Sequence, residues 1–160
     1  MSVRLALYHP EIPQNTGTLL RLGACVGVPL DIIEPCSFVL TDARLRRAGM
    51  DYVELSTLTR HENWEHFQAS LKAANRRCVL LCPRATTSYL DFAFTPQDTL
   101  LLGTESSGVP EDVAQACDAR VCIPMLPGRR SLNVAISGAV VLSEVLRQLK
   151  AFPPLVEKPA

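Results

Sequence analysis

Hydrophobic residues in this 160-residue chain gather in short continuous runs, separated by segments where they recur every three or four positions. Short apolar runs are typical of strands buried on both faces, and the wider spacing is typical of amphipathic helices. The pattern predicts strands at 3–8, 30–34, 77–82, 99–102 and 120–123, with a weaker one at 52–55. It predicts helices at 15–26, 42–48, 61–75, 110–117 and 131–149.

Capping signals set the expected helix ends. Asn15 is placed to cap the first helix, and Gly27 stops it. Gly49 follows the short basic helix at a position that favours glycine. Pro110 suits the first turn of the fourth helix. Ser131 and Asn133 open the last helix, where a side-chain cap is expected. Ser131 is the candidate for this cap, and Asn133 is expected inside the first turn, where it can contact a ligand.

Strands that alternate with helices predict an α/β fold with a mostly parallel sheet flanked by helices. The length suits one domain, which we expect to span 1–150. Residues 151–160 contain three prolines and are expected to form a flexible tail. The chain start shows no signal peptide, and no apolar stretch is long enough to span a membrane.

Composition and charge limit the kinds of partner that the chain is expected to bind. Apolar residues make up 48% of the chain, which excludes a mostly disordered protein, and the formal net charge is +0. Arginines nevertheless cluster: Arg44, Arg46 and Arg47; Arg76 and Arg77; Arg129 and Arg130. Such clusters are either solvated faces or a surface for nucleic-acid phosphates, and the sequence leaves both open.

Several kinds of site are excluded or disfavoured. The six cysteines form no Cys-x-x-Cys pair, so buried free thiols in a reducing, cytoplasmic setting are expected. Val109 and Pro110 follow Gly108, where a phosphate-binding loop needs Lys and Ser or Thr. His61 and His66 are five residues apart, which places them roughly 140° apart on a helix. No metal site is therefore predicted.

Three polar loops are candidates for a functional site, because each follows an apolar run and precedes a helical pattern. They are Pro-Glu-Ile-Pro-Gln-Asn-Thr-Gly at 10–17, Gly-Thr-Glu-Ser-Ser-Gly at 103–108 and Ile-Pro-Met-Leu-Pro-Gly-Arg-Arg-Ser-Leu-Asn at 123–133. Loops at strand ends are where α/β proteins bind ligands. The three loops are therefore expected to form one site.

Together these loops resemble the three motifs of the SPOUT family, the knotted S-adenosylmethionine-dependent RNA methyltransferases. The resemblance covers 3–150 and is closest to the small members that methylate the ribose 2′-hydroxyl of the wobble nucleotide, cytidine or uridine 34, of tRNA. Leu45-Arg46-Arg47-Ala48-Gly49-Met50-Asp51-Tyr52 extends it. It implies a C-terminal trefoil knot, S-adenosyl-L-methionine as methyl donor with S-adenosyl-L-homocysteine as product, a tRNA partner and a homodimer.

The resemblance also implies roles for single residues. Catalytic candidates are Arg21, Asn15, Glu105, Ser131 and Asn133. Donor-binding candidates are Leu81, Leu102, Gly103, Glu105, Gly108, Ile123, Met125, Ser131 and Leu132, since apolar side chains and loop backbone suit an adenine ring. RNA-binding candidates are Arg46, Arg47, Arg129 and Arg130. Glu105 is expected to orient Arg21 or a ribose hydroxyl.

Two departures from the subgroup keep alternatives open. Ile136 stands where a second asparagine is usual, and His9 where an acidic residue is common. The alternatives are 2′-O-methylation at another tRNA or rRNA site, and a non-catalytic module that binds RNA or a nucleotide.

The last helix carries an apolar stripe that points to an interface. Ile136, Ala139 and Val140 widen it beyond one face, which suggests burial on two sides. Since the resemblance implies a dimer around this helix, substitutions at Leu142 or Val145 are expected to disrupt it. The stripe consists of Val134, Gly138, Val141, Leu142, Val145 and Leu149.

Overall fold

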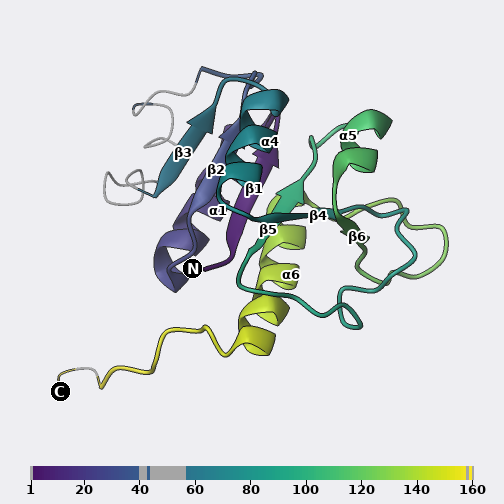
Figure 1. Ribbon diagram of the computed structural model, residues 1–160. Coiled ribbons are helices and arrows are strands. Elements are labelled where there is room, and N and C mark those ends of the chain that lie inside the picture. The colour runs from purple at the N-terminus through teal and green to yellow at the C-terminus, as the bar shows by residue number, and fades with distance from the viewer. Residues whose placement is uncertain (1, 40–42, 44–56, 158, 160) are drawn as a thin grey trace.

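The computed structural model describes residues 2–39, 43, 57–157 and 159. Its core is a six-stranded sheet in the order β3-β2-β1-β5-β4-β6, in which all paired strands are parallel (Figure 1). The strands are β1 (Arg4–Tyr8), β2 (Leu30–Ile33), β3 (Leu58–His61), β4 (Arg77–Leu81), β5 (Asp98–Leu102) and β6 (Ala119–Val121). The predicted α/β class with a parallel sheet is confirmed.

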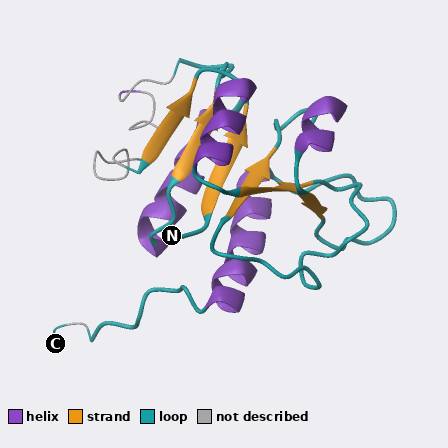
Figure 2. Cartoon of the chain, in the orientation of Figure 1, coloured by secondary structure: helices purple, strands orange, loops and turns teal. Residues whose placement is uncertain are grey.

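Helices cover both faces of this sheet (Figure 2). Alternate residues of β1 face opposite sides, so Leu5 and Leu7 pack in one apolar cluster, and Ala6 and Tyr8 in another. The first cluster includes residues of α1 and α6, and the second includes residues of α4 and α5. The helices are α1 (Pro13–Val26), α4 (Trp64–Ala73), α5 (Glu111–Ala116) and α6 (Val134–Leu149).

Helix starts differ from the predicted ones. Helix α1 begins at Pro13, whose fixed φ suits a first helical position, so Asn15 lies inside the helix and does not cap it. Helix α6 begins at Val134 with Asn133 as its cap, and Ser131 lies in the preceding loop. Pro110 likewise precedes α5 as its N-terminal cap residue. Helix α1 therefore starts earlier than predicted, whereas α5 and α6 start later.

One strand was missed and another was predicted too far along the chain. His61 ends β3, and the following helix begins only at Trp64, where the Asn63 side chain accepts from the His66 N–H at 2.8 Å. Strand β6 spans Ala119–Val121, so Ile123 belongs to the loop beyond it. The predicted helix at 42–48 and strand at 52–55 fall essentially outside the described residues.

The apolar stripe on α6 packs into the hydrophobic core of its own chain. Leu142 is 1% exposed and Val145 is fully buried, in one cluster with residues of β1, β5 and α1. The expectation that these two residues form a dimer interface is therefore wrong. Ile136, in the first turn of α6, is by contrast 55% exposed.

The C-terminal segment beyond α6 has neither helix nor strand at residues 151–157, and these residues are exposed. Figure 1 shows this segment in yellow, leading away from the sheet. Within the described residues, no helix combines the length and hydrophobicity needed to cross a bilayer.

Candidate functional site

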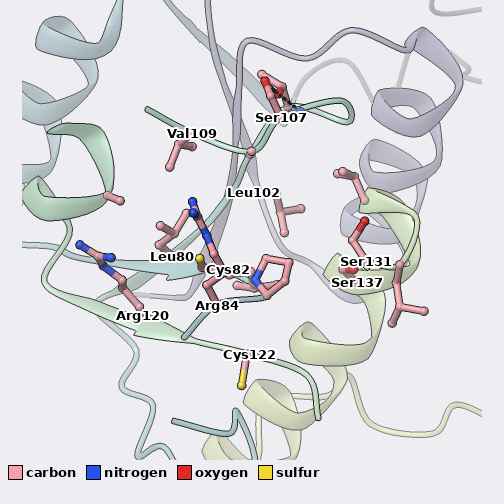
Figure 3. A pocket seen from close by; sticks show the side chains of 18 of the residues that line it. Leu80, Cys82, Arg84, Leu102, Ser107, Val109, Arg120, Cys122, Ser131 and Ser137 are labelled. Carbon is pink, nitrogen blue, oxygen red and sulfur yellow. Dashed lines mark hydrogen bonds between the residues drawn. The ribbon is translucent and has the colours of Figure 1, made fainter. Parts of the chain in front are cut away.

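A cavity of about 360 Å³ opens where β4, β5 and β6 end. Its size lies in the range of small-molecule sites, and its position at the carboxyl ends of parallel strands is where such folds bind ligands. Figure 3 shows the Leu80, Cys82 and Arg84 side chains on one side of it, and Ser131 and Ser137 on the side of α6.

The structure brings all nine predicted donor-binding residues to the wall of this one cavity. They come from three segments that are distant in sequence. The loops after β4 and β6 also lie side by side, since Cys122 donates its N–H to the Thr87 carbonyl and its own carbonyl accepts from Tyr89, both at 2.9 Å. The lining is apolar at the strand ends and polar in the loops, which suits a ligand with a flat ring and a charged end.

The loop after β5 closes on itself at its two glycines. The Thr104 N–H donates to the Gly108 carbonyl at 2.9 Å, and the Gly108 N–H returns a bond at 3.1 Å. A Cβ on Gly103 would lie 2.6 Å from the Gly108 backbone, and Gly108 has φ +70°. Both positions thus need glycine, for close approach and for left-handed backbone respectively.

Glu105 projects from this loop to the start of α1. Its carboxylate accepts from the backbone N–H groups of Glu11 at 2.8 Å and Ile12 at 3.1 Å, and from Asn15 Nδ2 at 3.4 Å. Helix α1 has no side-chain cap of its own, so Glu105 supplies acceptors from 90 or more residues away. The expected contact of Glu105 with Arg21 or a ribose stays a prediction.

Glu11 makes the reverse connection. One of its oxygens accepts from the Ser106 N–H at 3.0 Å and the Ser106 hydroxyl at 2.7 Å. These hydrogen bonds lower the pKa of Glu11, because they favour its charged form. The first and second loops are thereby held together from both sides.

Asn133 connects the third loop to the other two. Its Oδ1 accepts from the backbone N–H groups of Ala135 at 2.8 Å and Ile136 at 3.2 Å, which caps α6. Its Nδ2 donates to Asn15 Oδ1 at 3.1 Å. Because Asn15 in turn donates to Glu105, three of the predicted catalytic residues form one hydrogen-bonded chain beside the cavity.

The remaining predicted residues lie in different places. Arg21 is exposed on α1 and does not line the cavity of this single chain. Arg129 and Arg130 are exposed in the loop before α6, and Arg130 also lines the cavity. Arg46 and Arg47 fall outside the described residues. The structure therefore assembles the donor-binding set more completely than the catalytic or RNA-binding set.

Sequence reasoning missed several lining residues, including Arg84, Ser107 and Ser137. Arg84 directly follows a predicted strand in the pair Pro83-Arg84, and this position was the available signal.

The expectation for the cysteines is only partly met, since all six are free and Cys78 is buried but Cys25 is exposed. His61 pairs with Asp31 at 2.8 Å. Within the described part of the chain, no three metal-ligating side chains gather.

Glu105→Ala should lower the free energy of unfolding by about 1–2 kcal/mol, because the N–H groups of Glu11 and Ile12 lose their acceptor. Urea denaturation measures this. Glu111→Ala is the matched control, since it removes an exposed carboxylate from the same cavity wall and should change stability little. Equal losses for both variants would refute the capping role.

Comparisons with known proteins show which proteins this chain is similar to. The model of the SpoU rRNA Methylase family matches residues 2–143. The tRNA (cytidine(34)-2′-O)-methyltransferase of Beijerinckia indica subsp. indica is 52% identical over 155 residues, which cover 97% of each chain. A solved structure described as giving insights into the 2-OH methylation of C/U34 on tRNA has a TM-score of 0.85 and 38% identity, covering 93% of this chain and 97% of that one. An AdoMet-bound rRNA methyltransferase from Sinorhizobium meliloti has a TM-score of 0.82 and 26% identity, covering 92% and 57%.

Proposed function

The chain belongs to the SpoU rRNA methylase family, and we propose that it transfers a methyl group from S-adenosyl-L-methionine to the ribose 2′-hydroxyl of nucleotide 34 of tRNA. The observation that carries this function is the cavity at the ends of β4, β5 and β6, which is lined by all nine residues predicted to bind the donor. The relative that is 52% identical over nearly the whole chain supplies the substrate class.

The residues present fit the donor. Leu81, Leu102 and Ile123 at the strand ends offer apolar contacts to an adenine ring, and the Gly103 backbone can approach it closely. Ser131 and Glu105 add polar atoms at the loops. When bound, S-adenosyl-L-methionine supplies an electrophilic methyl group, and the protein's task is to place the ribose oxygen in line with it.

Arg21 is the residue to which we assign stabilisation of the ribose oxygen as it develops negative charge. A guanidinium is protonated at neutral pH and is a poor acceptor for the hydroxyl proton, so the proton passes instead to the adjoining phosphate or to water. Asn15, Glu105 and Asn133 fix the start of α1 and thereby the helix that bears Arg21. In this account they are positioning residues.

Three finer features belong to the same proposal. The chain forms a homodimer that uses the exposed start of α6, and Arg21 meets the site in that assembly. Its C-terminal part forms the family's trefoil knot, and the adjacent loops after β4 and β6 are consistent with it. A tRNA substrate and six free cysteines favour a cytoplasmic location.

The function is tested with two tRNA transcripts that differ only in the ribose of nucleotide 34. With radiolabelled donor, the transcript with a 2′-hydroxyl should become labelled and the 2′-deoxy transcript should not. Equal labelling of both would place the methyl group elsewhere, and labelling of neither would favour a binding module.

Binding of tRNA should weaken steeply with salt, because arginines displace counterions from phosphates. Alanine at Arg129 or Arg130 should each flatten the slope of log affinity against log salt by roughly one unit, if each meets one phosphate. Filter binding over a salt series measures the slope. Unchanged slopes for both would show that the RNA lies on another face.

A further inference from the structure

The cavity wall includes five charged side chains, and three of them have partners. Glu105 is engaged by the start of α1, and Arg120 Nη2 lies 3.4 Å from the Glu111 carboxylate. Within the described part of the chain, the other two guanidinium groups have no ion-pair partner. These two cations, Arg84 and Arg130, are free to bind an anion that enters the cavity.

Arg84 is held at the cavity by a tight turn. The Ala85 N–H donates to the Cys82 carbonyl at 3.0 Å, and the Cys82 N–H is bound to the Val121 carbonyl at 2.9 Å. Pro83 occupies the second position of this turn, where its fixed φ is favourable. The backbone of Arg84 is thus anchored to the ends of β4 and β6, and Figure 3 shows its side chain extending into the cavity.

Arg130 is placed differently. It lies in the loop between β6 and α6, two residues after Gly128 with its φ of +82°, and the residues around it are exposed. Its neighbour Arg129 does not line the cavity. Arg84 is exposed as well, but its turn is hydrogen-bonded to the ends of β4 and β6, whereas the loop of Arg130 also carries Arg129 outside the cavity, as expected for phosphate contacts.

The proposed donor brings one anionic group, the carboxylate of its methionyl end. A planar guanidinium binds a carboxylate through two parallel hydrogen bonds, which fixes orientation as well as charge. We propose that Arg84 binds this carboxylate and so sets the direction in which the donor lies in the cavity. The assignment deepens the proposed function and rests on it.

Two ligands that share the adenosine part test the assignment. S-adenosyl-L-homocysteine has the carboxylate, and 5′-methylthioadenosine lacks the whole amino-acid end. Arg84→Ala should weaken S-adenosyl-L-homocysteine about ten- to a hundredfold in calorimetry, the scale of losing a charged hydrogen-bond pair. It should leave 5′-methylthioadenosine nearly unchanged, and Arg84→Lys should recover part of the loss.

The control is Lys72→Ala, which removes one positive charge from the exposed surface of α4 and should change neither affinity. Equal weakening of both ligands by Arg84→Ala would overturn the proposal in favour of an adenosine contact. Unchanged affinity for both, with weaker tRNA binding, would assign Arg84 to an RNA phosphate. If the unmodified protein bound neither ligand, the proposed function itself would be contradicted.

Discussion

Arg21→Ala should transfer methyl groups about a hundredfold more slowly than the unmodified protein, or slower still, at saturating donor and tRNA. This is the scale of losing one preorganised electrostatic contact to a developing oxyanion. Donor affinity should remain nearly intact, because Arg21 does not line the cavity that we propose for the donor. Arg21→Lys should restore only part of the rate, since an ammonium keeps the charge but loses the planar fork.

Single-turnover transfer measures the Arg21 effect, since it separates the rate from binding. Arg60→Ala is the matched control, because it removes an arginine from the surface ion pair with Glu34 and should transfer at the ordinary rate. If Arg21→Ala transferred methyl groups at the normal rate, Arg21 would have a packing role and no catalytic one. If a higher tRNA concentration restored the transfer rate of the variant, Arg21 would act by binding a tRNA phosphate.

Leu142→Glu should destabilise the fold by about 4 kcal/mol or more, because it places a carboxylate without a partner inside the core. Ile136→Glu, six residues earlier on α6, replaces a side chain that is 55% exposed and should leave the chain folded. If the start of α6 is the dimer interface, this second variant should be monomeric.

Urea denaturation and light scattering, applied to both variants, separate folding from assembly. A folded Leu142→Glu protein would contradict the burial of α6 within the chain. A dimeric Ile136→Glu protein, or a monomeric unmodified protein at micromolar concentration, would refute the proposed interface.

The sequence predicted most of the fold because four of the six strands are largely apolar, and β6 adjoins the apolar residues that follow it. Strand β3 was not predicted from the sequence, because Thr59 and Arg60 are exposed and Leu58–His61 therefore contains no apolar run. Its polar residues find partners across the sheet, as when Arg60 pairs with Glu34. Only the tertiary structure decides that such a segment is a strand.

The candidate site was predictable as a set of loops but not as a network. Glu105 and Asn15 are 90 residues apart, and Asn15 and Asn133 are 118 apart, so their hydrogen bonds depend on the tertiary structure, in which β1 lies beside β5 and α1 packs against α6. The cap of α1 shows the same limit. Its acceptor is Glu105, and no local pattern around Pro13 indicates it.

Methylation of the ribose of nucleotide 34 can be tested by locating the transferred methyl group on tRNA. Total tRNA from cells lacking the gene is incubated with the protein and deuterated S-adenosyl-L-methionine, then digested and mapped by mass spectrometry. We expect a deuterated methyl group on the 2′-oxygen of cytidine or uridine 34. Label on a base, on another nucleotide or on no nucleotide would contradict it.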